Sequence, residues 1–100
     1  MGVPSLPNRL EGRVAEIGET GNLVTDISVD QIADIPHDDS VTIRFGGHET
    51  VGIFPANHGQ PDATMVASMG QTGYLEIEIV GISLSEMLGI KTGVPVEVSW

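Results

Sequence analysis

The stretch Gly18–Ile27, GETGNLVTDI, decides the fold of this chain, because a polar turn bracketed by glycines runs directly into a strand. Alternate residues of that strand face the same side, and on one side these are Leu23, Thr25 and Ile27. Asn22 stands at the junction between turn and strand. Loop residues held by a rigid strand are well placed for binding, so Asn22 is the first candidate functional residue.

Working outward, the same period of two recurs along the chain and predicts about seven short strands. We expect them at residues 10–17, 22–27, 41–45, 48–54, 64–69, 74–80 and 94–100. Ser28 is followed three residues later by a Gln, and Ser83 is followed three residues later by a Glu. This spacing is typical of a capping box at the start of a helix, so the sequence predicts one or two single-turn helices. Gly89 would end the second helix in a left-handed conformation.

This pattern predicts an all-β fold, a small antiparallel barrel with one or two single-turn helices. A barrel is favoured over a sandwich, since closure removes the exposed edges of a small sheet. One hundred residues have room for one modest core. We therefore expect a flexible N-terminal arm over residues 1–9, which contains two prolines, and a single β-barrel domain over residues 10–100.

The charge balance excludes several classes of partner. Four basic residues against fourteen acidic ones give a net charge of −10, so nucleic acid and anionic membranes are poor partners. The chain has no cysteine, which removes disulfides, thiolate zinc sites and thiol nucleophiles, and which fits a cytoplasmic protein. No apolar run reaches the length of a membrane span, and the N-terminus lacks the apolar core of a signal peptide.

Few residues point to catalysis. The sequence His37-Asp38-Asp39 has metal-ligand chemistry, but adjacent residues rarely converge on one ion, so a solvated turn is the favoured interpretation and we expect no metal. Glu76 and Glu78 share one face of a strand, where an acid–base pair and an ordinary solvent face are the alternatives. Neither a serine nucleophile elbow nor a glycine-rich phosphate loop occurs.

Three motifs carry a family resemblance. The stretch Gly12–Ile27 resembles the "G-x-V-…-G-N-x-x-T-N-I" start of the C-terminal domain of the S-adenosylmethionine (SAM) hydroxide adenosyltransferases, relatives of the SAM-dependent chlorinases and fluorinases. Gly70–Glu76, GQTGYLE, is similar to the family's "G-S-x-G-x-L-E-I-A" segment. A short helix from Ser83 to Gly89, followed by a "G-x-x-V-x-V" pattern, is the third match.

The resemblance implies a ligand-binding role. Asn22 matches an Asn that contacts adenine, and Asn suits that edge because one amide both donates and accepts. Val24 matches a residue that lines the same pocket, and Phe54 is a candidate for stacking on the purine, with a core role at the strand end as the alternative. Gln71, which stands where the family has Ser, and the backbone at Gly81 are two further candidate ligand-binding positions.

The differences between this sequence and the family limit the activity that can be expected of the chain. The family's catalytic carboxylate lies in an N-terminal α/β domain that nothing in these residues replaces, so we expect no catalysis by the chain alone. The first hypothesis is a free-standing, non-catalytic or half-site module that binds adenosine or SAM, with no other cofactor. Its partners would be an adenine nucleoside, a separately encoded α/β catalytic chain and other copies of itself, in a homo-oligomer such as the family's trimer.

A second hypothesis belongs to another class. The family's polar side chains are lost at Gln71 and over residues 80–82, which favours a structural or oligomerisation module that no longer binds a ligand. Hydrolysis by the isolated chain is a third hypothesis, for which the sequence offers no activated nucleophile or base.

Overall fold

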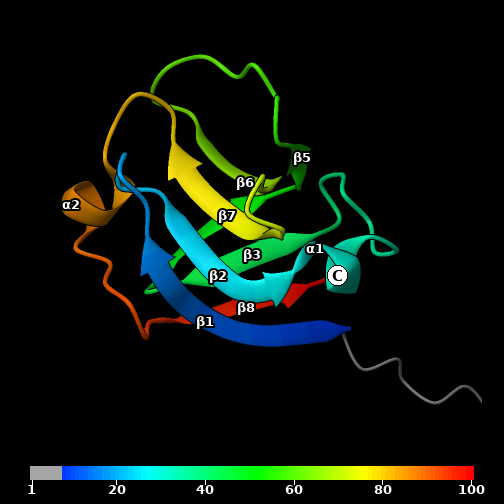
Figure 1. Cartoon of the computed structure of the whole chain (residues 1–100). Helices are drawn as coiled ribbons and strands as arrows, with labels where there is room; N and C mark the ends of the chain where they lie inside the picture. The colour runs from blue at the N-terminus through cyan, green and yellow to red at the C-terminus, as the bar shows by residue number, and fades with distance from the viewer. Residues whose placement is uncertain (1–7) are drawn as a thin grey trace, which may run out of the picture.

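The computed structural model describes residues 8–100 and contains one curled sheet with two short helices (Figure 1). The strands are β1 (Arg9–Ile17), β2 (Leu23–Ser28), β3 (Thr42–Phe45), β4 (His48–Val51), β5 (Phe54–Pro55), β6 (Met65–Met69), β7 (Tyr74–Ile79) and β8 (Pro95–Ser99). The helices are α1 (Val29–Ile32) and α2 (Leu84–Leu88). The predicted all-β class is therefore confirmed.

The sheet has eight strands in the order β4-β3-β8-β1-β2-β7-β6-β5 and curls into a half-barrel. The curl brings β4 against β6, where the Thr50 hydroxyl donates to the Met65 carbonyl at 3.4 Å. Among residues 8–100, β4 and β5 are the ends of the strand order. Curling thus takes the place of the complete closure expected from the sequence.

The structure has eight strands where the sequence predicted about seven, because the chain turns at Gly52. The sequence predicted one strand over residues 48–54, but Gly52 has φ of +87°, and a strand cannot continue through that conformation. The chain turns there, so that Phe54 and Pro55 pair with β6 in parallel, whereas every other strand pair is antiparallel. The expectation of a wholly antiparallel sheet is wrong at this edge.

Both predicted serines cap a helix, but the complete capping box forms only at Ser28. The Ser28 hydroxyl accepts from the Gln31 amide and the Gln31 side chain accepts from the Ser28 amide, which is a complete capping box. Ser83 caps α2 by accepting from the Glu86 amide, and Gly89 ends α2 with φ of +68°.

The flexible N-terminal arm was expected over residues 1–9. Residues 1–7 lie outside the described part of the chain, whereas Arg9 belongs to β1 and pairs with Ser99.

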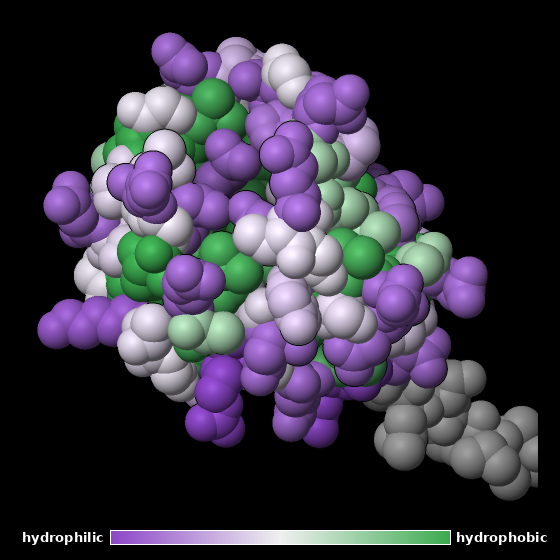
Figure 2. All heavy atoms as spheres, in the orientation of Figure 1, coloured by the Kyte–Doolittle hydropathy of each residue, from purple (hydrophilic) through white to green (hydrophobic). Residues whose placement is uncertain are grey.

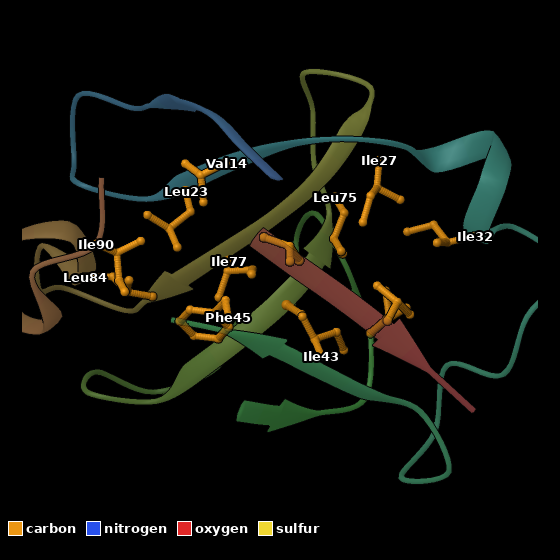
Figure 3. Packing of buried hydrophobic residues seen from close by; sticks show 14 of the residues in the cluster. Val14, Leu23, Ile27, Ile32, Ile43, Phe45, Leu75, Ile77, Leu84 and Ile90 are labelled. Carbon is orange, nitrogen blue, oxygen red and sulfur yellow. The ribbon is translucent and has the colours of Figure 1, made fainter. Parts of the chain in front are cut away.

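The core lies inside the curl of the sheet. In Figure 3, Phe45 of β3 lies across the curl from Leu23 and Ile77, which are paired neighbours on β2 and β7. Leu84 of α2 and Ile90 close one end of this core, while Ile32 of α1 belongs to the same cluster (Figure 3). In the described part of the chain, no helix is long and apolar enough to span a bilayer.

Candidate functional site

A row of four side chains crosses the outer face of β2, β7, β6 and β5. Val24 pairs with Glu76, Glu76 with Ser68, and Ser68 with Phe54, so their side chains share the face opposite to the core. Two predicted ligand residues, Val24 and Phe54, therefore lie on one face. Three strand spacings of about 4.8 Å separate them, so the sheet does not bring them into contact.

An amide–carboxylate pair joins the start of β2 to this row of side chains. The Asn22 Nδ2 donates to Glu76 Oε1 at 2.9 Å, although the two residues are 54 positions apart. The Thr20 hydroxyl donates to Asn22 Oδ1 at 3.0 Å, and the Thr72 hydroxyl donates to Glu76 Oε2 at 2.8 Å. We call these four residues the Asn22–Glu76 network. It fixes the side chain of Asn22 at both ends of its amide.

Two hairpin turns of the same pattern, Gly-x-Thr-Gly, supply this network. Gly18–Gly21 joins β1 to β2, and Gly70–Gly73 joins β6 to β7. In each turn the last glycine amide donates to the first glycine carbonyl, at 2.9 and 3.1 Å. In each turn the amide of the first glycine also donates to the carbonyl of the residue after the turn, at 2.8 and 3.1 Å.

The first glycine of each turn makes room for the network. A Cβ on Gly18 would lie 2.1 Å from Asn22 Oδ1, and a Cβ on Gly70 would lie 2.2 Å from Glu76 Oε2. Neither distance is sterically allowed, so the polar side chains occupy the space that the two glycines leave. The first glycine of each motif is thereby explained by its close approach to a side chain of the network.

A shallow pocket of about 280 Å³ adjoins the network. Thr20, Glu78 and Gly81 line it, together with Ile79, Ile82 and Ser83. Gly81 is exposed and has φ of +77°, and its nearest side chain is that of Asp62. Of the predicted ligand residues, Gly81 lines this pocket directly, and Asn22 is connected to it through Thr20.

Phe54 contacts a histidine instead of an open cavity. Its ring meets that of His58 edge to face, with ring centroids 6.3 Å apart. His58 Nδ1 accepts from the Gln60 amide at 3.0 Å, and its Nε2 lies 3.5 Å from Glu78 Oε2. The imidazole is only 9% exposed. Both of its nitrogens are therefore engaged within the chain, and the loop after β5 is held against the outer face of β7.

Gln71 lies apart from the network. It is exposed at the tip of the β6–β7 turn, and its neighbour Thr72 makes the contact to Glu76. Sequence reasoning missed Thr20 and Thr72 and assigned Glu76 no part in binding. The repeated Gly-x-Thr-Gly pattern was the available signal, since two equal turns place equivalent hydroxyls beside the network.

The His37-Asp38-Asp39 stretch is a turn whose polar groups are engaged locally. His37 Nε2 lies 2.7 Å from the Ile32 carbonyl, and Asp38 accepts from the amide and the hydroxyl of Ser40. Those two hydrogen bonds from Ser40 lower the pKa of Asp38 below its ordinary value. Over residues 8–100, no three His, Asp or Glu side chains gather as a metal site would require.

A larger groove of about 910 Å³ lies across β1, β8, β3 and β4, away from the predicted ligand residues. Four carboxylates line it, those of Glu11, Asp26, Glu49 and Glu97, against the two guanidinium groups of Arg13 and Arg44. Arg44 lies 3.6 Å from Glu97 and 4.0 Å from Glu49, and such exposed pairs contribute little stability.

The chain is thus a small all-β domain, a half-barrel that carries the hydrogen-bonded Asn22–Glu76 network at the β2–β7 pair of its sheet. Figure 2 shows the face drawn in Figure 1 as polar side chains interspersed with small apolar patches. The model of the SAM hydroxide adenosyltransferase C-terminal domain matches residues 12–97. The chain belongs to this family, as its motifs indicated.

Two solved structures support the same assignment. An uncharacterized conserved protein from Thermotoga maritima is 26% identical, with a TM-score of 0.74 over 88% of this chain and 35% of that one. A conserved hypothetical protein from Thermus thermophilus is also 26% identical, with a TM-score of 0.62 over 88% and 32%. The chain thus spans about a third of either structure. No curated protein is significantly similar in sequence.

Proposed function

We propose that this domain binds an adenine nucleoside, adenosine or SAM, on the outer face of the sheet, as the non-catalytic half of a site. One observation carries the proposal: Asn22, which matches the family's adenine-contacting Asn, is held by Thr20 and Glu76, and Thr20 lines the neighbouring pocket. An amide fixed in this way can donate and accept at the same time, as recognition of adenine requires.

We assign His58 and Glu76 to binding and to the structure of the site, and we give neither of them a catalytic role. Both His58 nitrogens face the domain's own atoms, and Glu76 accepts from Asn22 and Thr72. A general base must reach a substrate proton, and neither side chain is available to do so. We therefore assign the chemistry to a further α/β component, with which this domain would complete the pocket, as in the trimeric assembly expected of the family.

Isothermal titration with adenosine and with SAM tests the binding. We expect heat with both ligands for the wild-type chain and a loss of about tenfold or more in affinity for Asn22→Ala, which removes both adenine contacts. Gln71→Ala is the matched control, since Gln71 is exposed and outside the network, and it should bind as the wild type does. Absence of heat at millimolar ligand would refute the proposal.

The second candidate is a structural or oligomerisation module without a ligand. It is favoured by the separation of Val24 from Phe54 on the sheet and by the contact of Phe54 with His58. Sedimentation equilibrium distinguishes the two functions. A stable trimer in the absence of nucleoside, combined with no binding heat, would favour the structural or oligomerisation module. Self-association of the chain that becomes tighter when adenosine is added would favour the nucleoside-binding function.

A further inference from the structure

The Asn22 amide has a fixed orientation because its neighbour on β7 is a carboxylate. An ionised carboxylate can only accept hydrogen bonds, so the amide nitrogen of Asn22 must face Glu76, and the amide oxygen must face Thr20. Turning the amide over would place its oxygen against Glu76 Oε1, two acceptors at hydrogen-bond distance. Thr72 holds the other oxygen of Glu76 and so keeps the carboxylate itself in place.

This arrangement leaves a defined pair of groups for a ligand. The Asn22 nitrogen has two hydrogens and donates one to Glu76, and its oxygen has two lone pairs and receives Thr20 on one. One donor and one acceptor remain. Adenine offers the complement on either polar edge, because its exocyclic amine donates beside a ring nitrogen that accepts.

We propose that Glu76 is a specificity-determining residue, which fixes the Asn22 amide so that the site accepts adenine and rejects hypoxanthine. This inference rests on the proposed nucleoside binding. Hypoxanthine has a carbonyl where adenine has the amine, so one of its edges reverses donor and acceptor and the other has acceptors only. A freely turning amide would accommodate the reversed edge, whereas the amide held by Glu76 does not.

The substitution Glu76→Gln isolates this role. Glutamine keeps the shape of the side chain but brings an amide that either donates or accepts, so Asn22 gains the freedom to turn over. Titration with adenosine and inosine gives the ratio of affinities as the readout. We expect the wild type to prefer adenosine by about tenfold or more, and we expect that preference to fall to within about threefold in Glu76→Gln, with inosine binding gained.

Two further variants control the result. Glu11→Gln makes the same chemical change on an exposed strand carboxylate of β1 and should keep the wild-type preference. Thr72→Val removes only the hydroxyl that holds Glu76 Oε2, so it should weaken the preference even if Glu76→Gln were to fold poorly. The side-chain amide resonances of Asn22 in the ligand-free protein should move in Thr72→Val and Glu76→Gln and stay unchanged in Glu11→Gln.

The outcomes separate this inference from the proposed function. Preference for adenosine that persists in Glu76→Gln overturns the role of Glu76 and leaves nucleoside binding standing. Equal binding of adenosine and inosine by the wild type also overturns it. No binding of either nucleoside by the wild type refutes the proposed function itself and, with it, the specificity assigned to Glu76.

Discussion

Gly21 and Gly73 occupy the same place in two equal turns but have different surroundings. Both have positive φ, +82° and +90°. A Cβ on Gly21 would lie 1.9 Å from the Ser83 hydroxyl and 2.7 Å from the Ser83 Cα, whereas a Cβ on Gly73 would meet no atom within 4 Å. Comparing an alanine substitution at these two glycines therefore separates the destabilisation caused by a left-handed backbone from the destabilisation caused by steric crowding.

We expect Gly73→Ala to lower the free energy of unfolding by about 1 kcal/mol, the cost of a left-handed alanine. Gly21→Ala should lower it by about 3 kcal/mol or more, since it must also displace the backbone at the start of α2. Urea denaturation of both variants measures the difference. Equal losses would show that the close approach of Gly21 to Ser83 does not exist in solution.

Asp38 gives a prediction for acid conditions. Because its folded-state pKa is lowered by the Ser40 bonds, the charged form is favoured in the folded chain. This stabilisation is present above the unfolded pKa of about 3.9 and is lost as pH falls through the folded value, which lies below it. Asp38→Asn should therefore be less stable than the wild type near neutral pH, and the difference should shrink below about pH 4.

Thermal unfolding of both proteins between neutral and acid pH measures this trend. Ser40→Ala, which removes the hydroxyl that donates to Asp38, is the companion variant, and its difference from the wild type should shrink in the same direction. A difference for Asp38→Asn that stayed constant over that range would contradict the assignment of the shift to Ser40.

At the scale of the element, β2 depends on one buried hydroxyl. Thr25 is 1% exposed, donates to the Leu75 carbonyl at 2.8 Å and accepts from the Ile27 amide at 3.2 Å. These bonds lie where the β2–β7 register shifts between Val24 and Ser28, and regular ladder pairing is lost there. The hydroxyl thus satisfies backbone groups that the irregularity would leave without partners.

We expect Thr25→Val, which keeps the shape and removes the hydroxyl, to lower the free energy of unfolding by about 1–3 kcal/mol, the cost of buried polar groups left unsatisfied. Thr50→Val is the matched control, because the Thr50 hydroxyl makes only a 3.4 Å contact to Met65, and it should cost less. Chemical denaturation measures both. A Thr25→Val protein as stable as the wild type would contradict the structural role of the hydroxyl.

Sequence patterns predicted elements well where the chemistry is local. The period of two in β7 and the capping serine before each helix depend on residues close in the chain, and both are confirmed. The break at Gly52 was missed because a glycine inside an alternating pattern does not reveal its φ. In α2, Leu84 is buried but Met87 is 61% exposed, since a helix of five residues buries only a narrow strip.

The candidate site was predictable only in part. Asn22 could be singled out because it joins a turn to a strand, but its partner Glu76 is distant in the chain and follows from strand pairing alone. The position of Phe54 depended on the unpredicted turn at Gly52. The contact that holds it, His58 on a loop, has no periodic signal that the sequence could have offered.

For the whole molecule, the net charge of −10 is the dominant electrostatic feature. In the described residues, Arg9 and Arg44 are paired with carboxylates of the β1–β8–β3–β4 part of the sheet. The other acidic side chains repel one another across the compact fold, and this repulsion is screened by salt.

We therefore expect sodium chloride to stabilise the protein. Raising the ionic strength from a few millimolar to a physiological value should increase the free energy of unfolding by on the order of 1 kcal/mol, which raises the Tm by about 4–8 °C for a domain of this size. Thermal unfolding at both ionic strengths measures it. A Tm that falls with salt would mean that the surface ion pairs outweigh the repulsion.

The first and last strands of the described chain are direct neighbours, and their outer ends exchange two backbone hydrogen bonds between Asn8 and Trp100, at 3.1 and 3.0 Å. A short peptide joining those ends would therefore bridge a gap no wider than a hairpin. New ends opened at Gly47, where the β3–β4 turn is exposed and uncrowded, would interrupt none of the strand pairings. The domain is thus suited to circular permutation, and to insertion into a surface loop of a host protein.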